Sequence, residues 1–103
     1  MDKKTIINTL QLLNKEYREK GFEFVGLFGS YARGTEDLFS DIDLTYRINH
    51  ELFYKDNAFA KLEELQKIKK ELEKRFHKKV DLIPANTKNP MIQESLQREQ
   101  IAI

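Results

Sequence analysis

The stretch GSYARGTEDLFSDIDL, residues 29–44, contains two of the four glycines of the chain and, near its end, Asp41 and Asp43, which are separated by a single residue. A run rich in phenylalanine, FEFVGLF, precedes it and indicates a buried strand over residues 22–28. The segment SDIDLTYRI alternates, with Asp41, Asp43 and Thr45 on one face and apolar residues on the other. The stretch therefore predicts a strand, a Gly-Ser turn, a short helix beginning near Ser30, and a second strand with a polar side.

Helical periodicity flanks this unit on both sides. Residues 3–20 carry apolar side chains every three or four positions and are followed by Gly21, a natural helix stop. Residues 58–77 form the longest periodic segment. We expect its apolar stripe to belong to the core and its Lys/Glu run to be a solvated face; the stripe is Phe59, Leu62, Leu65, Ile68, Leu72 and Phe76.

The last third of the chain adds a strand and a helix. KKVDLIP indicates a third strand that ends at Pro84, because proline lacks the N–H that a ladder needs. Asn89 and Pro90 suit the cap and first turn of a final helix. The closing IAI is either a frayed end or a fourth short strand. The order of elements predicts an α/β fold of the α+β kind, in which helices pack on a small mixed sheet.

Length and charge limit the possible functions. The 103 residues suffice for a single domain, 1–103, but not for an additional substrate domain. Charged residues make up 34% of the chain, with 18 Lys+Arg against 17 Asp+Glu, so we expect no direct nucleic-acid binding. No apolar run is long enough for a membrane span, and we find no signal peptide. With no cysteine, the chain suits a reducing cytoplasm.

The Gly-Ser turn has a possible chemical use. Glycine lets a ligand approach the backbone closely, and N–H groups at the start of a helix attract anions, so Gly29 and Ser30 could hold a phosphate. The simpler interpretation is a glycine turn followed by a serine cap. Carboxylates at positions 41 and 43 of one strand lie on the same face, about 7 Å apart at their roots, and could converge on Mg²⁺. The simpler interpretation here is a polar edge that faces solvent.

A third carboxylate interrupts an apolar strand at Asp81. Alone, it would be a surface acid paired with Lys78 or Lys79. Together with Asp41 and Asp43 it completes the set of acids that a two-metal site requires.

These residues resemble a known signature. GSYARGTEDLFSDIDL is similar to the G-S-x-A-R-G…S-D-x-D-L motif of the DNA polymerase beta nucleotidyltransferase superfamily, and KKVDLIP resembles the strand that carries the third aspartate of that superfamily. The resemblance covers essentially the whole chain, and the short length resembles the minimal nucleotidyltransferase (MNT) group. It implies a nucleotidyltransferase palm, and MNT members often act as antitoxins beside a helical HEPN ribonuclease toxin.

The resemblance also implies roles for individual residues. Gly29 and Ser30 would grip the triphosphate of ATP. Two Mg²⁺ ions would be bound by Asp41 and Asp43, and Asp81 would ligate the catalytic ion and could accept the proton of the incoming hydroxyl. Arg33 could reach phosphate or pair with a site aspartate, the alternative being an ordinary surface arginine. The implied reaction transfers AMP from ATP to a tyrosine hydroxyl of the HEPN toxin, which loses its ribonuclease activity.

Two other functions stay open at the level of the sequence. The chain could neutralise a toxin by binding alone, or it could transfer a nucleotide to a small molecule such as an aminoglycoside. We expect Ser40 to brace the aspartate strand rather than to react. His50 and His77 have no partner at metal-ligand spacing, so we expect both at the surface.

Overall fold

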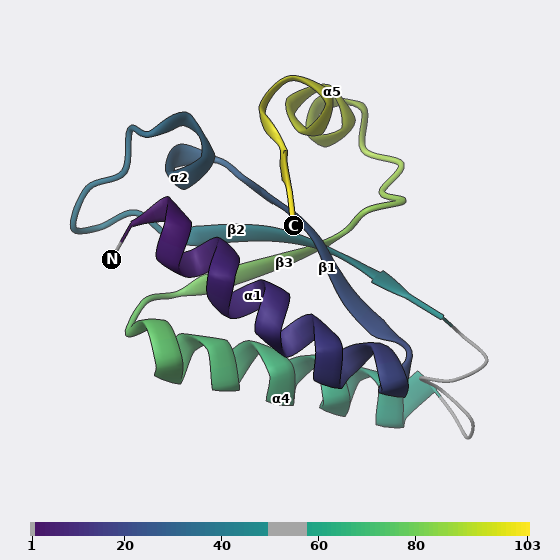
Figure 1. Cartoon of the computed structure of the whole chain (residues 1–103). Helices are drawn as coiled ribbons and strands as arrows, with labels where there is room; N and C mark the ends of the chain where they lie inside the picture. Colours follow the sequence, from purple (N-terminus) through teal and green to yellow (C-terminus); the bar gives the residue numbers. More distant parts are fainter. Residues whose placement is uncertain (1, 50–57) are drawn as a thin grey trace.

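A four-stranded mixed sheet is the centre of the fold, which a computed structural model describes for residues 2–49 and 58–103 (Figure 1). Within these ranges only the backbone is described for residues 58–61 and 95. The strand order is β3-β2-β1-β4, with β1 antiparallel to β2 and β4, and β2 parallel to β3. The predicted mixed sheet is confirmed, and the closing residues form a strand. The strands are β1 (Phe22–Phe28), β2 (Ile42–Ile48), β3 (Val80–Pro84) and β4 (Ile101–Ala102).

The first helix, α1, spans Lys3–Tyr17. It begins at Asp2, whose carboxylate accepts a hydrogen bond from the backbone N–H of Thr5 at 2.9 Å. A 3-10 turn, η1 (Arg18–Lys20), continues it to Gly21, where φ is 87°. The predicted helix over residues 3–20 and its stop at Gly21 are both confirmed.

The other helices that the structure describes also lie where the sequence predicts them. A single turn, α2 (Ser30–Arg33), follows β1, and the long helix α4 (Ala58–Phe76) joins β2 to β3. The last helix, α5 (Pro90–Glu99), is capped by Asn89, whose side chain accepts from the N–H of Met91 at 3.0 Å. In the part of the chain that the structure describes, no helix combines the length and the apolar character needed to cross a membrane.

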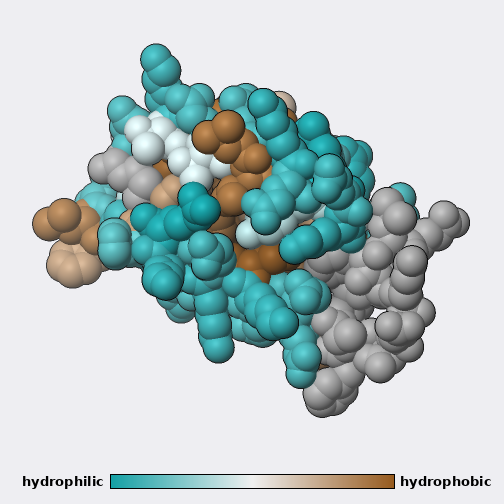
Figure 2. All heavy atoms as spheres, turned by 60° about the horizontal axis from the view of Figure 1, so that its bottom comes forward, coloured by the Kyte–Doolittle hydropathy of each residue, from teal (hydrophilic) through white to brown (hydrophobic). Residues whose placement is uncertain are grey.

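The core lies between the sheet and the two long helices. Figure 1 shows α1 and α4 on one face of the sheet and α5 on the other side, while α2 lies where β1 ends. Figure 2 views the helical side, where hydrophilic surface surrounds a narrow apolar seam. Alternation in β2 directs Ile42 and Leu44 into this core. Its fully buried apolar side chains include Ile6, Leu10, Phe22, Phe24, Leu27, Tyr31, Leu72 and Val80.

The predicted core stripe of α4 is confirmed only in its second half. Ile68, Leu72 and Phe76 are buried, and Leu65 packs partly against them, but Leu62 is 61% exposed. Leu62 lines a pocket at the surface together with Leu82 and Ile83 of the edge strand β3. The side chain of Phe59 lies outside the described residues.

One buried polar side chain links α1 to the sheet. Asn14 is 1% exposed, donates to the carbonyl of Phe24 at 3.0 Å and accepts from the N–H of Phe24 at 2.7 Å. Strand β4 pairs with β1 only at Gly26 and Leu27, so it is too short to reach Phe24. Asn14 thus satisfies backbone groups that would otherwise be buried without a partner.

Candidate active site

Two of the predicted acids stand side by side in the sheet. Asp43 is the second residue of β2 and Asp81 the second residue of β3, and the parallel register pairs them directly. On its other side Asp43 is paired with Phe28, the last residue of β1. Because Gly29 follows Phe28, the register places the glycine turn and both aspartates at the same end of the sheet.

The electrostatics of Asp43 reflect this crowding. Burial raises the pKa of Asp43, and the nearby Asp81 adds repulsion and a hydrogen bond to the protonated form, so that the pKa reaches about 6. The charge of Asp41 raises this pKa further, while the guanidinium of Arg33 lowers it. Carboxyl groups this close repel each other when both are ionised, and a bound cation would offset that repulsion.

Gly29 is packed against the carboxyl of Asp43. Its φ of 77° and ψ of −155° are accessible to glycine and strained for other residues. A Cβ atom at this position would lie 2.2 Å from Oδ2 of Asp43. Glycine is therefore required here both by the turn and by the aspartate.

Asp41, the third predicted acid, lies just outside the ladder. It is half-buried and lies one residue before β2, so the ladder does not fix it. Among residues 2–49 and 58–103, no three Asp, Glu, His or Cys side chains are gathered closely enough to hold a metal ion as they stand. The structure thus brings Asp43 and Asp81 together, and the charge of Asp41 acts on Asp43. Three carboxylates at one end of a sheet still fit the oxygen ligands that Mg²⁺ prefers.

Arg33, the last residue of α2, has a partner that the sequence does not reveal. Its Nη1 donates to Oε2 of Glu99 at 2.8 Å, at the end of α5. Ser30, in contrast, is the first residue of α2 and lies beside the glycine turn, as predicted. Arg33 therefore pairs with a distant acid rather than with a site aspartate, although its charge reaches Asp43.

The loop between α2 and β2 is braced from inside. Oγ of Ser40 accepts from the N–H of Asp37 at 2.9 Å, so Ser40 braces the loop that leads into the aspartate strand. Lys78 donates to the carbonyls of Leu38 and Ser40 at 3.1 and 3.4 Å. Lys78 thus supports the loop. The same loop holds Leu38 and Phe39 outward, 88% and 91% exposed.

A polar contact beside the aspartates also could not be predicted from the sequence. Thr45 lies two residues after Asp43 in β2 and is fully buried, because Gln100 covers it. Oγ1 of Thr45 lies 2.8 Å from Oε1 of Gln100, and a Cβ on Gly26 would lie 2.4 Å from Cγ of Gln100. The predicted polar side of β2 is therefore partly covered by the end of α5.

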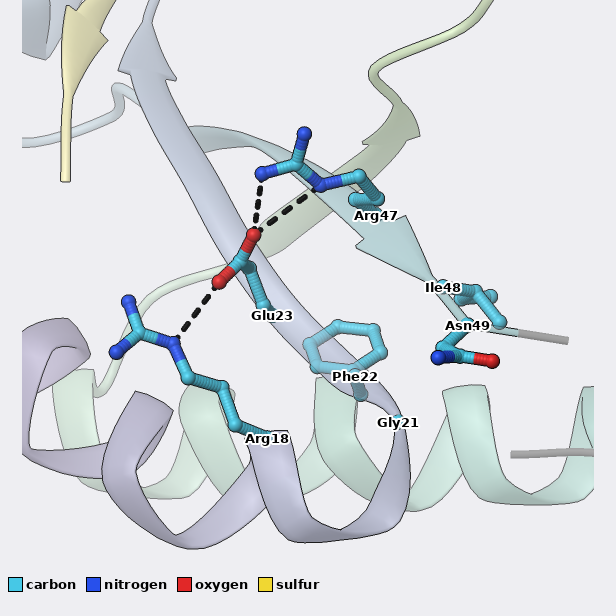
Figure 3. A pocket seen from close by; sticks show the side chains of 7 residues that line it. All are labelled: Arg18, Gly21, Phe22, Glu23, Arg47, Ile48 and Asn49. Atoms are coloured by element: carbon cyan, nitrogen blue, oxygen red, sulfur yellow. Dashed lines mark hydrogen bonds and ion pairs between the residues drawn. The ribbon is translucent and has the colours of Figure 1, made fainter. Parts of the chain in front are cut away.

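A separate pocket of about 390 Å³ lies at the opposite end of β1 and β2 (Figure 3). The charged side chains that line it form ion pairs with one another: Glu23 pairs with Arg18 at 2.9 Å and also with Arg47. Hydrogen bonds from Arg47, and from Arg18, lower the pKa of Glu23. The arrangement suits a structural ion pair. His77 is exposed as predicted, and His50 lies outside the described residues.

Comparisons with known proteins identify relatives of this chain. Residues 5–103 match the family Polymerase beta, Nucleotidyltransferase. A protein of Methanocaldococcus jannaschii, provisionally named a protein adenylyltransferase, is 31% identical over 94 residues, which cover 90% of this chain and 85% of the relative. The chain therefore belongs to the polymerase beta nucleotidyltransferase family, and it is a nucleotidyltransferase.

Solved structures support the same fold. One described provisionally as a minimal nucleotidyltransferase has a TM-score of 0.72 and 25% identity, and the likeness covers 100% of this chain and 97% of that one. Two toxin-antitoxin structures are more distant. One, solved with AMP-PNP, has a TM-score of 0.61 and 21% identity. The other, a MntA-HpeT variant with two aspartates replaced by glutamate, has a TM-score of 0.58 and 17% identity. Each covers 89% of this chain and 69% of the other, and shows the fold alone.

Proposed function

We propose that this chain is a cytoplasmic antitoxin that transfers AMP from ATP, with Mg²⁺, to a tyrosine hydroxyl of a HEPN ribonuclease toxin and so neutralises it. The observation that carries the proposal is the pairing of Asp43 with Asp81 directly beside the Gly29 turn. Two further observations support it. The relative from Methanocaldococcus jannaschii is named a protein adenylyltransferase, and proteins of similar fold occur in toxin-antitoxin pairs, one of them solved with AMP-PNP.

In the proposed reaction each part of the site has a separate task. Gly29, Ser30 and Arg33 hold the phosphates of ATP. Two Mg²⁺ ions held by Asp41, Asp43 and Asp81 would supply positive charge that offsets the charge developing on the phosphates. The acceptor oxygen forms a bond to the α-phosphorus, and the bond from that phosphorus to the bridging oxygen breaks.

The proton of the acceptor and the leaving group each have a destination in this reaction. Pyrophosphate leaves with the electrons of the broken bond, and the hydroxyl proton passes to the carboxylate of Asp81. Because Asp81 lies at the edge strand of the sheet, an acceptor can approach it from outside the protein.

The loop before Asp41 favours a protein acceptor over a small molecule. Leu38 and Phe39 are almost fully exposed, and hydrogen bonds from Lys78 and to Asp37 fix the loop that presents them. In Figure 2 an apolar group projects at the left edge, the side on which this loop lies in Figure 1. Exposed aromatic and aliphatic side chains are common anchors of protein interfaces.

Transfer of radiolabel from α-labelled ATP to a HEPN ribonuclease, which we expect to be encoded next to this chain, tests the proposal. With Mg²⁺ we expect label on a tyrosine of the ribonuclease and loss of its RNase activity. The variant Asp41→Asn/Asp43→Asn should give no label. Equal labelling by that variant would refute the catalytic assignment, and neutralisation without labelling would indicate an antitoxin that acts by binding alone.

A second variant tests the loop that presents Leu38 and Phe39. We expect Leu38→Ser/Phe39→Ser to retain ATP binding and to weaken transfer to the protein. The matched control is Leu12→Ser, which removes a side chain that is 66% exposed on α1. If Leu38→Ser/Phe39→Ser labels the ribonuclease as well as Leu12→Ser does, the loop with Leu38 and Phe39 does not contact the acceptor.

A further inference from the structure

Arg33 and Glu99 connect two distant parts of the chain beside the candidate site. They are 66 residues apart in sequence, and each is the last residue of its helix, α2 or α5. Their ion pair of 2.8 Å is partly shielded, since the side chains are 47% and 26% exposed. Arg33 is also close enough to Asp43 for its charge to act on that carboxyl. One guanidinium therefore acts on both the end of α5 and Asp43.

The position of Glu99 is fixed by the residue that follows it. The side chain of Gln100 lies on Gly26, where a Cβ would be 2.4 Å away, and its Oε1 lies 2.8 Å from Oγ1 of the buried Thr45. The N–H of Gln100 donates to the carbonyl of Leu96 at 3.1 Å. Strand β4 then begins at residue 101 and pairs with β1. The end of α5 is thus held on the sheet, and Glu99 is a fixed anchor for Arg33.

We propose that Glu99 is a positioning residue, which holds Arg33 so that its guanidinium can contact a phosphate of the bound nucleotide. This inference rests on the proposed function, because it requires a triphosphate at the Gly29 turn. Glu99 accepts a hydrogen bond from one N–H group of Arg33. The other N–H groups of this guanidinium have no hydrogen-bond partner among the described residues. These N–H groups suit two phosphate oxygens. A long side chain that is already ordered loses less conformational entropy when the ligand binds.

An opposing effect must be weighed, because Glu99 also places a negative charge near a triphosphate. If charge alone decided the affinity, removing Glu99 would tighten nucleotide binding. Exposed charges are strongly screened in water at physiological salt, whereas the ordering of Arg33 is a local contact. We therefore expect positioning to be the larger effect.

Three substitutions at one position separate the two effects. Glu99→Gln keeps an oxygen that can accept from Arg33 and removes only the charge. Glu99→Ala removes both. Glu99→Lys removes the negative charge and repels Arg33, so charge alone would tighten binding while loss of positioning would weaken it. The measurement is calorimetric titration of the full chain with ATP and Mg²⁺, without an acceptor.

We expect Glu99→Ala and Glu99→Lys to raise the Kd for ATP about three- to tenfold, the effect of ordering one long side chain. Glu99→Gln should stay within about twofold of the wild type. Arg33→Ala/Glu99→Ala should bind no more weakly than Arg33→Ala alone, because Glu99 acts through Arg33. Glu71→Ala is the matched control, since it breaks an ion pair to Arg75 of 3.4 Å on α4, with side chains 48% and 50% exposed.

The outcomes distinguish this inference from the proposed function. If Glu99→Ala and Glu99→Lys bind ATP as tightly as the wild type or more tightly, while Arg33→Ala binds it more weakly, the role of Glu99 is overturned and the proposed function is not. Additive losses in the double variant also overturn the role of Glu99. A wild-type chain that does not bind ATP with Mg²⁺ overturns the proposed function as well. Thermal unfolding of each variant confirms that differences in Kd come from folded protein.

Discussion

Asp43 shows how a single residue couples the chemistry of the site to the stability of the fold. Its pKa is raised from 3.8 to about 6, first by burial and then by Asp81. A raised pKa means that the folded protein binds the proton more tightly than the unfolded chain does. The stabilisation is fully present below about pH 3.8 and is lost as the pH rises through about 6. At neutral pH, without a cation, the ionised carboxyl is a local source of instability.

The variant Asp43→Asn tests this pH dependence, because an amide does not titrate. As the pH rises from about 4 to about 7, we expect the wild type to lose stability relative to the variant, so that the difference in their free energies of unfolding shifts in favour of the variant. At pH 7, Mg²⁺ should stabilise the wild type and so reverse part of this shift. Urea unfolding at several pH values measures the difference. Other titrating groups contribute to both proteins, so a difference that is constant over this range would contradict the raised pKa.

At the same scale, the sequence predicts some site residues better than others. Asp43 and Asp81 could be predicted because an acid in an apolar strand is unusual and the two strands share a sheet. Glu99 could not, because it looks like any charged residue of a surface helix and its partner Arg33 is 66 residues away. The alternating pattern places Asp41 within the strand, but β2 begins one residue later, and the ladder therefore does not fix its side chain.

The turn between β1 and α2 is the element on which the site depends, and Gly29→Ala should disrupt it. Its backbone conformation costs about 1–3 kcal/mol for a residue with a Cβ, and that Cβ would lie 2.2 Å from Asp43. We expect Gly29→Ala to lower the free energy of unfolding by at least this amount and to abolish transfer. Thermal and urea unfolding measure the first effect, and the labelling assay measures the second.

Gly34 offers a matched control for that substitution. Its φ is 76°, also left-handed, but a Cβ at this position would have no neighbouring atom within 4 Å, so Gly34→Ala suffers backbone strain without a clash. We expect Gly34→Ala to lose about 1–2 kcal/mol and to keep the site. If the two variants were equally stable and equally active, close packing of Gly29 on Asp43 would not matter.

Whole elements follow the sequence closely, and the exceptions have physical causes. Helix α1, strand β1 and the cap at Asn89 were predictable because each depends on local periodicity or a local turn. The buried state of Thr45 was not, because Gln100 reaches it from the other end of the chain. Leu62 follows the apolar stripe of α4 but lines a pocket at the surface beside the edge strand β3, and it is exposed. Periodicity gives the face of a helix, whereas the position of the helix on the sheet decides how much of that face is covered.

At the scale of the whole molecule, the candidate site joins segments that are far apart in sequence. Residues 29–43 supply the turn and two acids, β3 supplies Asp81, and the end of α5 supplies Glu99. The sheet brings the first two together, and β4 pairs the chain's last residues with β1. A ligand that contacts the turn, the acids and Arg33, which Glu99 holds, should therefore stabilise the fold as a unit.

Thermal unfolding with nucleotide tests this coupling. A ligand at about 100 times its Kd adds about 2.7 kcal/mol, and in a domain of this size 1 kcal/mol shifts the Tm by about 4–8 °C. We expect ATP with Mg²⁺ to raise the Tm by on the order of 10 °C. Either component alone should raise it much less, because carboxylates and triphosphate repel each other without the cation. The rise should disappear in Asp41→Asn/Asp43→Asn, whereas an equal rise in EDTA would mean that ATP binds without the aspartates.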